Sequence, residues 1–325
     1  MKEYKIASIA GDGIGQEVVP EAHKVLNEVA AQHQFKINFD QFDFASCDYY
    51  EKHGKMLPDD WKDKIGKHDA IFFGAVGMPD RYPDHITLWG SLLQFRREFD
   101  QFINLRPVKL FPGVNPPLAN KKPGDIDMLI VRELTGGLYF GEKKSSKTSA
   151  SDLCEYSIDE IERVTEIAVN YAKIRRKKIT LIDKANVLET SRLWRKTVQN
   201  ISKKHTDINF EYMFVDNAAM QMIINPKQFD VILTENLFGD IISDEASVIG
   251  GSIGILCSSS IGKNRGLFEP IHGSYPQAKN KNIANPIATI LSAAMMLEFL
   301  NLNEESRIIK KAVNISLENK ISTAD

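Results

Sequence analysis

One segment of the chain reads Phe229-Asp230-Val231-Ile232-Leu233-Thr234-Glu235-Asn236-Leu237-Phe238-Gly239-Asp240-Ile241-Ile242-Ser243-Asp244-Glu245. Its first five residues predict a buried strand, and the apolar residues after Gly239 recur at helical spacing. Asp240 and Asp244 are four residues apart, so a helix places both carboxylates on one face, with Cβ atoms about 5–6 Å apart. Such a pair suits a hard cation, Mg²⁺ or Mn²⁺, that takes oxygen ligands. A solvated helix start, where acids favour the macrodipole, explains the pair equally well.

Length and composition indicate a globular chain with a sizeable core. It has 325 residues, 43% of them hydrophobic, which is enough for two domains or one large α/β unit. The net charge of −2 and a pI near 6.4 do not call for nucleic acid or an anionic membrane. Three scattered cysteines argue against a disulfide framework and favour a reducing, cytoplasmic location. The N-terminus enters a strand-like run without the pattern of a signal peptide.

Apolar runs at residues 4–10, 70–77, 178–183 and 209–215 predict strands, with helical patterns between them. Polar residues recur where these strands end, which indicates an open α/β sheet with its site along that edge. A glycine-rich turn, Gly11-Asp12-Gly13-Ile14-Gly15, follows the first strand. Its third glycine is one position early for a Rossmann fingerprint. It therefore predicts a backbone that approaches something closely.

Three local predictions concern helices. The apolar stripe over residues 88–99 predicts one helix. Ser157 and Glu160 form a capping-box pattern at the start of a second helix. The basic run at residues 175–178 closes that second helix, where positive charge suits the C-terminal end of the dipole.

Single polar residues at strand ends are candidates for chemistry. Arg132 follows an apolar run, where a charge usually has a partner, and its planar fork matches a carboxylate. Tyr139 lies in a glycine-dense segment and could act as a general acid beside a cation, although a lone Tyr in such a segment more often serves packing. Lys184 follows the strand at residues 178–183 and is a candidate base if burial lowers its pKa.

From residue 11 to about residue 296, the chain resembles the metal-dependent β-decarboxylating 2-hydroxyacid dehydrogenases. This family includes 3-isopropylmalate, isocitrate, homoisocitrate, tartrate and D-malate dehydrogenases. Residues 236–245 resemble its metal helix, residues 269–274 its cofactor loop, and residues 283–286 the segment that closes the cofactor site.

The resemblance implies an α/β, isopropylmalate dehydrogenase-like two-domain fold with a large mixed sheet flanked by helices, which is not a Rossmann fold. Residues 1–101 and 254–325 would form a cofactor-binding domain that contains both termini. Residues 102–253 would carry the metal, the substrate and the dimer interface. The implied assembly is a homodimer with shared active sites, in which Lys184 and Asp216 come from the partner subunit.

The resemblance also implies a role for each site residue, with NAD as cofactor and Mg²⁺ or Mn²⁺ as metal. The implied residues are Tyr139 and Lys184 for catalysis; Arg96, Arg106, Arg132, Leu92, Leu93 and Val187 for the substrate; Asp216, Asp240 and Asp244 for the metal; and Glu269, His272, Gly273, Ser274, Gln277 and Asn285 for the cofactor. Tyr275 and Gln277 depart from the family pattern, in which a small residue and an Asp are usual. This departure predicts NAD use with weaker discrimination against NADP.

The substrate expectation draws on two branches of the family. Residues 84–93 and 111–113 resemble tartrate and D-malate dehydrogenases, whereas residues 134–141, 183–189 and 216–221 resemble 3-isopropylmalate dehydrogenase. Apolar Leu92, Leu93 and Val187 favour oxidative decarboxylation of 3-isopropylmalate to 2-oxoisocaproate, a step of leucine biosynthesis. The alternatives are D-malate or tartrate, favoured by Trp89, and a non-catalytic partner subunit. A prenyl-diphosphate site built on Asp-rich helices would need an all-helical chain.

Overall fold

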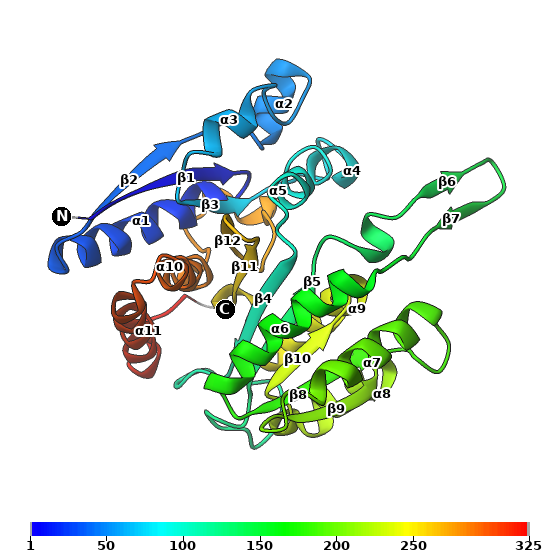
Figure 1. The fold of residues 1–325 in the computed structure, drawn as a ribbon. Helices are drawn as coiled ribbons and strands as arrows, with labels where there is room; N and C mark the ends of the chain where they lie inside the picture. Colours follow the sequence, from blue (N-terminus) through cyan, green and yellow to red (C-terminus); the bar gives the residue numbers. More distant parts are fainter. Residues whose placement is uncertain (1, 324–325) are drawn as a thin grey trace. The chain divides into compact units, whose positions relative to one another are not determined.

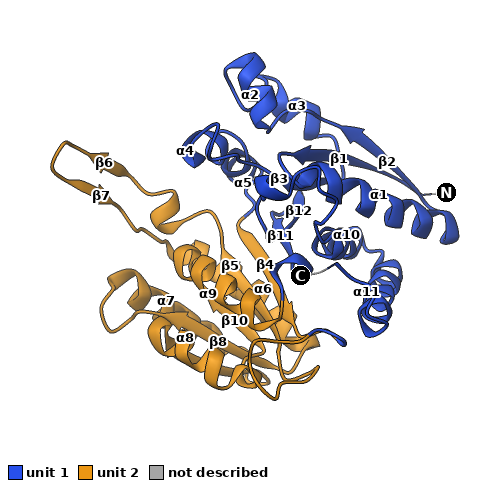
Figure 2. Ribbon diagram, turned by 180° about the vertical axis from the view of Figure 1, so that it is seen from behind, with its two compact units in different colours: residues 1–101, 112–114, 252–325 blue, residues 102–111, 115–251 orange. Residues whose placement is uncertain are grey.

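The computed structural model describes residues 2–323 and divides into two compact units, coloured separately in Figure 2. Unit 1 comprises residues 1–101, 112–114 and 252–325, and unit 2 comprises residues 102–111 and 115–251. Each unit combines a mixed sheet with helices, so the predicted mixed α/β fold is confirmed.

The sheet of unit 1 has the strand order β2-β1-β3-β12-β11 (Figure 1). The strands are β1 (Glu3–Gly11), β2 (Lys36–Gln41), β3 (Ala70–Ala75), β11 (Cys257–Ile261) and β12 (Gly266–Pro270). The helices are α1 (Gly15–Gln32), α2 (Cys47–His53), α3 (Trp61–Ile65), α4 (Asp84–Thr87), α5 (Leu92–Glu98), α10 (Ile287–Phe299) and α11 (Asn303–Glu318). Because β11 runs antiparallel to β12, this sheet differs from that of a Rossmann domain, as predicted.

The core of unit 1 follows from two sequence patterns. All six residues of β3 are buried, as expected of a continuous apolar run that is covered on both faces. Helix α1 buries Val18, Ala22, Leu26 and Val29, which recur every three or four residues and form one stripe. Helix α10 packs against α1, α11 and β12.

The glycine-rich turn after β1 confirms the predicted close approach. A Cβ atom on Gly13 would lie 2.0 Å from the carbonyl oxygen of Ser274, and Gly13 has a φ of +56°. The Ile14 amide donates to that same carbonyl oxygen at 2.8 Å. The turn therefore approaches the chain's own backbone, and only glycine has room there.

Unit 2 has the strand order β4-β5-β10-β8-β9, and a separate hairpin formed by β6 and β7 (Figure 1). The strands are β4 (Ile103–Lys109), β5 (Asp127–Glu133), β6 (Lys143–Ser145), β7 (Ala150–Asp152), β8 (Lys178–Asp183), β9 (Asn209–Phe214) and β10 (Val231–Thr234). The helices are α6 (Ile158–Ile174), α7 (Glu189–Ser202), α8 (Val215–Ile224) and α9 (Asn236–Ile249). Strand β4 is antiparallel to β5, and β6 is antiparallel to β7, whereas β5, β10, β8 and β9 pair in parallel.

The parallel register brings the carboxyl ends of three strands of unit 2 to one edge. Thr234, at the end of β10, pairs with Arg132 on β5 and with Ile182 on β8. Helix α6 packs beside α7, while α8 packs beside α9, and α9 also contacts β5 and β10. The residues that follow or end these strands therefore gather at the edge that the sequence predicted for a site.

The predicted helix over residues 88–99 is wrong in its first turn, because α5 begins only at Leu92. Residues 84–87 form the separate helix α4, and Ser91 leaves the helical region with φ −135° and ψ −87°. Gly90 lies so close to the Ile86 carbonyl oxygen that a Cβ atom would stand 2.6 Å from it. The tight turn at Gly90 thus interrupts the pattern.

The basic run after α6 has a different cause from the one predicted. Arg175 donates from Nε to Asp230 at 2.8 Å and from Nη2 to Asp127 at 2.6 Å. Asp230 is buried, and the Arg176 amide also donates to it at 2.8 Å. These arginines neutralise carboxylates at the starts of β5 and β10, so specific ion pairs explain them better than the helix dipole does.

Within residues 2–323, none of the helices is long and apolar enough to cross a membrane.

Candidate active site

The start of α9 is capped by a side chain. Glu235 precedes the helix and accepts hydrogen bonds from the amides of Phe238 at 2.7 Å and Leu237 at 3.2 Å. These bonds satisfy two of the free amides at a helix start. The helix then carries Asp240 and Asp244 on one face, as the sequence predicted.

Two arginines from neighbouring strands contact these two carboxylates. Arg132, on β5 and 1% exposed, forms an ion pair with Asp240 through Nη1. Arg106, on β4, places Nη1 3.4 Å from Asp240 Oδ1 and 3.3 Å from Asp244 Oδ1. Arg106 Nη1 also donates to Ser243 Oγ at 2.6 Å.

Tyr139 completes this cluster from the glycine-dense segment. It lies in a 3₁₀ turn over Gly137–Tyr139, and its hydroxyl donates to Asp240 Oδ2. The guanidinium carbon of Arg132 lies 5.4 Å from the centre of the Tyr139 ring. Asp240 therefore receives an arginine on one oxygen and a phenol on the other.

The charged groups of the cluster shift the pKa of Asp244 in opposite directions. Burial raises the pKa of Asp244, and the neighbouring Asp240 raises it further, whereas Arg106 and Arg132 lower it. Asp244 is still 67% exposed through its side chain, while Asp240 is 31% exposed. Two guanidinium groups thus hold two carboxylates close together on a partly open surface, where oxygen atoms of the exposed Asp244 remain accessible to a cation.

Lys184 and Asp216 form a separate pair. Lys184 follows β8, Asp216 lies in the first turn of α8, and Lys184 Nζ is 2.6 Å from Asp216 Oδ1. The hydrogen bond from Lys184 lowers the pKa of Asp216. Within residues 2–323, no three His, Cys, Asp or Glu side chains are grouped so that they could hold a metal ion. One copy of the chain therefore does not bring Asp216 together with Asp240 and Asp244.

The predicted apolar substrate residues lie in different surroundings. Leu92 and Leu93, on α5 of unit 1, are each 8% exposed, and Leu92 packs in a core cluster with Ile71 and Phe73. Val187, after β8 of unit 2, is 59% exposed. Arg96, also on α5, places Nη2 3.4 Å from Glu269 Oε1 within unit 1.

The predicted cofactor residues lie along one loop of unit 1. Glu269 is buried on β12, and His272 Nδ1 lies 2.9 Å from the Gly273 carbonyl oxygen. The Ser274 hydroxyl donates to the Gly77 carbonyl oxygen, which fixes the middle of the loop. Asn285 is buried and accepts from the Ile287 amide at 3.0 Å, at the start of α10.

The same loop leaves room on its outer side. Among the described residues, apart from Gly273 and its two chain neighbours, no heavy atom lies within 4 Å of the position that a Cβ atom on Gly273 would take. Gln277 is exposed, and Tyr275, 55% exposed, has a φ of +40° that favours glycine. The loop therefore has open space beside the Cα atom of Gly273, and it exposes two uncharged side chains, Tyr275 and Gln277.

Sequence reasoning assigned no role to three buried residues beside the cluster, namely Tyr156, Glu235 and Asn236. Asn236 accepts from Arg132 Nε at 3.1 Å and from Nη2 at 2.7 Å. Its position was a usable signal, because Asn236, Asp240 and Ser243 recur at helical spacing within the quoted segment. Tyr156 had no such signal, since it lies in a loop 80 residues from its partner Asn236.

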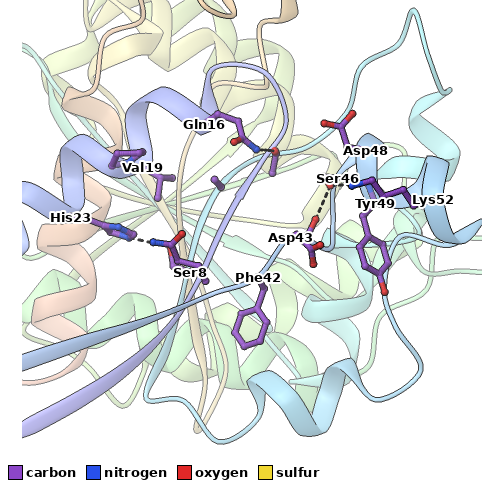
Figure 3. A pocket seen from close by; sticks show the side chains of 14 residues that line it. Ser8, Gln16, Val19, His23, Phe42, Asp43, Ser46, Asp48, Tyr49 and Lys52 are labelled. Atoms are coloured by element: carbon purple, nitrogen blue, oxygen red, sulfur yellow. Dashed lines mark hydrogen bonds between the residues drawn. The ribbon is translucent and has the colours of Figure 1, made fainter.

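A cavity of about 460 Å³ lies in unit 1 between α1, α2 and the ends of β1 and β2 (Figure 3). Its walls include Ser8, His23, Phe42, Tyr49 and Lys52, and the predicted site residues lie elsewhere. Figure 3 shows the hydrogen bond of 3.0 Å between Ser8 Oγ and His23 Nε2. Burial lowers the pKa of His23 to about 4, so this imidazole is neutral near pH 7.

Comparison with known proteins places these observations in a family. The model of the isocitrate/isopropylmalate dehydrogenase family matches residues 5–325. D-malate dehydrogenase (decarboxylating) of Escherichia coli (strain K12) is 46% identical over 94% of this chain and 87% of that protein. A 3-isopropylmalate dehydrogenase of Carboxydothermus hydrogenoformans is also 46% identical, over 99% of this chain and 89% of that protein.

A solved structure agrees with the sequence comparisons. The crystal structure of isocitrate dehydrogenase from Methylococcus capsulatus matches with a TM-score of 0.88 at 34% identity. The match covers 97% of this chain and 91% of that one. The relatives named for D-malate and for 3-isopropylmalate are both 46% identical to this chain, and the isocitrate dehydrogenase is 34% identical.

Proposed function

The chain belongs to the isocitrate/isopropylmalate dehydrogenase family, and from this premise we propose that it oxidatively decarboxylates 3-isopropylmalate to 2-oxoisocaproate with reduction of NAD. The family and the relatives indicate a decarboxylating dehydrogenase that acts on a small molecule. The observation that carries the proposal is the cluster of Arg106, Arg132, Tyr139, Asp240 and Asp244 in unit 2.

Arg106 and Arg132 would bind the carboxylates of the malate core, with Arg96 as a third cation. A guanidinium presents parallel N–H donors that match two carboxylate oxygens. Arg106 and Arg132 contact Asp240 and Asp244, and these ion pairs hold both guanidinium groups beside the acids. A bound malate carboxylate would replace part of that contact.

Lys184 and Tyr139 would handle the protons. Lys184 would accept the proton of the 2-hydroxyl group, and the Asp216 carboxylate, 2.6 Å from its Nζ atom, would stabilise the ammonium group that results. Tyr139 would give a proton to C3 after CO₂ has left, and the nearby Arg132 favours the phenolate that results. General acid–base groups of this kind typically supply about 10²–10⁴-fold in rate.

The donor set fits a hard divalent cation. Asp240 and Asp244 offer carboxylate oxygens on one helix face, and Asp216 of a second copy would add a third. For NAD, the loop with Glu269, His272, Gly273, Ser274, Gln277 and Asn285 offers open backbone at Gly273. When bound, Mg²⁺ or Mn²⁺ supplies Lewis-acid polarisation of the oxygen on C2, and the nicotinamide supplies a hydride acceptor.

We also propose a homodimer with shared sites, because enzymes of this family are generally dimeric. Helices α8 and α9 pack together and expose large apolar side chains. These are Met220, Ile223, Ile224, Ile241 and Val248, each 50–67% exposed. A patch of that kind is typical of an interface. The three free cysteines keep a cytoplasmic location part of the proposal.

The substrate is tested by the ratio of kcat/KM for 3-isopropylmalate and D-malate under one metal and cofactor concentration. The isopropyl group would bury about three carbons, worth about 2.4 kcal/mol at ~0.8 kcal/mol each. We therefore expect a preference of roughly 30–70-fold for 3-isopropylmalate. A higher kcat/KM for D-malate would refute the substrate assignment and leave the reaction class intact.

D-malate is the second candidate, and one observation favours it. Leu92 packs into the core of unit 1, which leaves less of it to line a pocket, and the bulky Trp89 is 37% exposed nearby in the chain. Substituting Trp89→Ala separates the two proposals. If Trp89 narrows the pocket, this variant gains activity on 3-isopropylmalate relative to D-malate.

The metal assignment has its own test. Asp244→Asn should lose most of the activity and keep the fold, because it removes one oxygen charge from the donor set. Glu245→Gln, at the next position of α9, is the matched control and should stay near wild type. Full turnover of Asp244→Asn, or of the wild-type enzyme in excess EDTA, would remove the metal from the proposal.

A further inference from the structure

Behind the arginine and aspartate cluster lies a buried chain of hydrogen bonds that begins at Glu235. This side chain is 7% exposed. Besides capping α9, its Oε2 accepts from the hydroxyl of Tyr156 at 3.1 Å. Burial raises the pKa of Glu235, whereas the two amides of α9 and the Tyr156 hydroxyl lower it. A buried carboxyl group that accepts three hydrogen bonds has little freedom to move.

Tyr156 connects Glu235 to Asn236. Its hydroxyl donates to Glu235 and accepts from the Asn236 amide at 3.0 Å, so one oxygen links consecutive residues at the start of α9. The ring, 6% exposed, packs edge-to-face on Trp194 with centroids 5.4 Å apart. A phenylalanine would keep this packing and lose both hydrogen bonds.

The loop that carries Tyr139 rests on the ring of Tyr156. Cβ atoms on Gly136 and Gly137 would stand 2.7 Å and 2.3 Å from atoms of Tyr156. Gly137 also has a φ of +69°. The two glycines therefore allow the loop to lie against Tyr156, which fixes how far Tyr139 stands from α9.

Asn236 links these contacts to Arg132 in the cluster of arginines and aspartates. Its side chain is 1% exposed, and its Nδ2 donates to the Gly136 carbonyl oxygen at 3.1 Å. Its Oδ1 accepts two hydrogen bonds from Arg132, at Nε and Nη2, which leaves Nη1 of that arginine for Asp240. Because the amide nitrogen is held by a carbonyl, the amide oxygen must face the guanidinium.

From this geometry we infer that Asn236, held in place by Tyr156 and Glu235, is a positioning residue that sets the angle of the Arg132 fork and the place of the Tyr139 loop. The inference rests on the proposed function, in which Arg132 binds a carboxylate of the hydroxyacid. Asn236 itself contacts Arg132 and Gly136, so it acts on the substrate only through them. A guanidinium that loses the one acceptor of two of its hydrogen bonds is free to rotate, and a bidentate contact with a carboxylate depends on that angle.

The test uses two variants, Tyr156→Phe and Asn236→Ala, in the full-length chain with wild type alongside. Both should raise the KM for the hydroxyacid about tenfold or more, which corresponds to 1.4 kcal/mol. The KM for NAD should stay within twofold, because the cofactor residues lie in unit 1. Equilibrium binding of the hydroxyacid in the presence of Mg²⁺ should weaken by the same factor without any turnover.

Trp194→Phe is the matched control. It removes packing on the other side of the Tyr156 ring, and none of the hydrogen bonds described above. It should lower the melting temperature as much as Tyr156→Phe does and leave the hydroxyacid KM unchanged. An equal rise in KM for Trp194→Phe would mean that lost stability alone explains the effect, and that result overturns the inference.

The other outcomes separate the inference from the function on which it rests. Wild-type turnover with an unchanged hydroxyacid KM in both folded variants overturns the positioning role alone. If wild type reduces neither NAD nor NADP with 3-isopropylmalate or D-malate, the proposed function and the inference fall together. If Asn236→Ala does not fold, Tyr156→Phe decides, since it keeps the ring and the fold around it.

Discussion

Gly239 lies where the backbone of α9 passes close to the side chain of Arg132. A Cβ atom at this position would stand 2.6–3.0 Å from the Cβ, Cγ and Cδ atoms of Arg132. Arg132 is buried and held by Asn236 and Asp240, so it has little freedom to move aside. The absence of a side chain at residue 239 is therefore what lets an arginine of β5 reach the acid on α9.

Gly239→Ala should accordingly displace Arg132 and lower kcat/KM for the hydroxyacid by about 10²-fold, the loss typical of a misplacement near 1 Å. Alanine favours a helix over glycine, so the melting temperature should change little. Gly250→Ala, at the end of the same helix, is the control, since its Cβ atom would meet neighbours only at 3.4 Å or more. Steady-state kinetics decide the matter, and wild-type kcat/KM in Gly239→Ala would contradict this account.

His23 illustrates how burial of one residue affects stability with pH. Its pKa is lowered to about 4 by burial, while the unfolded chain protonates it near 6.5. The unfolded state therefore binds more protons between these values, and the folded state loses stability as the pH falls from about 6.5 through 4. Above pH 6.5 this contribution is fully present.

We expect His23→Gln to flatten the loss of stability between pH 6.5 and pH 4 relative to wild type. The urea midpoint at several pH values measures it. The exposed His85, replaced by Gln in the same way, serves as the control and should leave the slope unchanged. A His23→Gln slope that parallels wild type would show that His23 titrates in the folded protein as it does in the unfolded chain.

At the scale of elements, local patterns predicted well where their cause is local. The capping box at the start of α6 is confirmed, with both reciprocal hydrogen bonds present, and β8 spans the predicted residues 178–183. The start of α5 was missed because the turn at Gly90 has no local signature. The pairing of Arg175 with Asp127 and Asp230 joins residues 48 and 55 apart, and spacing along the chain does not reveal such partners.

In the candidate site, too, the sequence predicted features with a local cause and missed contacts between residues far apart in the chain. The face shared by Asp240 and Asp244 could be predicted from helical spacing. The meeting of Arg132, Tyr139 and Asp240 could not, because it depends on the register of β5 beside β10, and family resemblance supplied that expectation. Tyr156 and Glu235 were missed because their roles arise from a hydrogen bond across 79 residues.

The exposed apolar side chains of α8 and α9 allow a prediction about dimer formation. Ile241 and Val248 lie seven residues apart on one face of α9, 58% and 60% exposed, and Met220 is exposed on α8, which packs against α9. Burying large aliphatic side chains contributes about 1.5–3 kcal/mol each, so a charge among them opposes association. Ile241→Lys should therefore yield a monomer in sedimentation experiments, with loss of activity.

Ile174→Lys is the control for that variant. Ile174 ends α6, on a different element, and is 80% exposed. The same charge there should leave the association state as it is in wild type. A dimer that survives Ile241→Lys, or one that is broken equally by Ile174→Lys, would place the interface elsewhere.

At the scale of the whole molecule, the separation of the acids suggests that the site is completed by a second copy. Lys184 and Asp216 are paired with each other, whereas Asp240 and Asp244 are held by arginines. The described part of one chain contains no grouping of three such side chains suited to a metal. We propose that in a two-fold dimer the Lys184 and Asp216 pair of each copy completes the site of the other copy's Asp240 and Asp244.

Mixing two inactive variants tests this arrangement. In a heterodimer of Lys184→Met with Asp244→Asn, one site receives both changes and the other receives neither. Random exchange of equal amounts makes half of the dimers mixed, so about a quarter of all sites become intact. Activity should therefore rise from near zero to about a quarter of wild type once exchange is complete. Mixing Lys184→Met with a chain that carries both changes cannot build an intact site and should stay inactive. If subunit exchange is confirmed by mass spectrometry and the first mixture stays as inactive as the second, each site lies within a single chain.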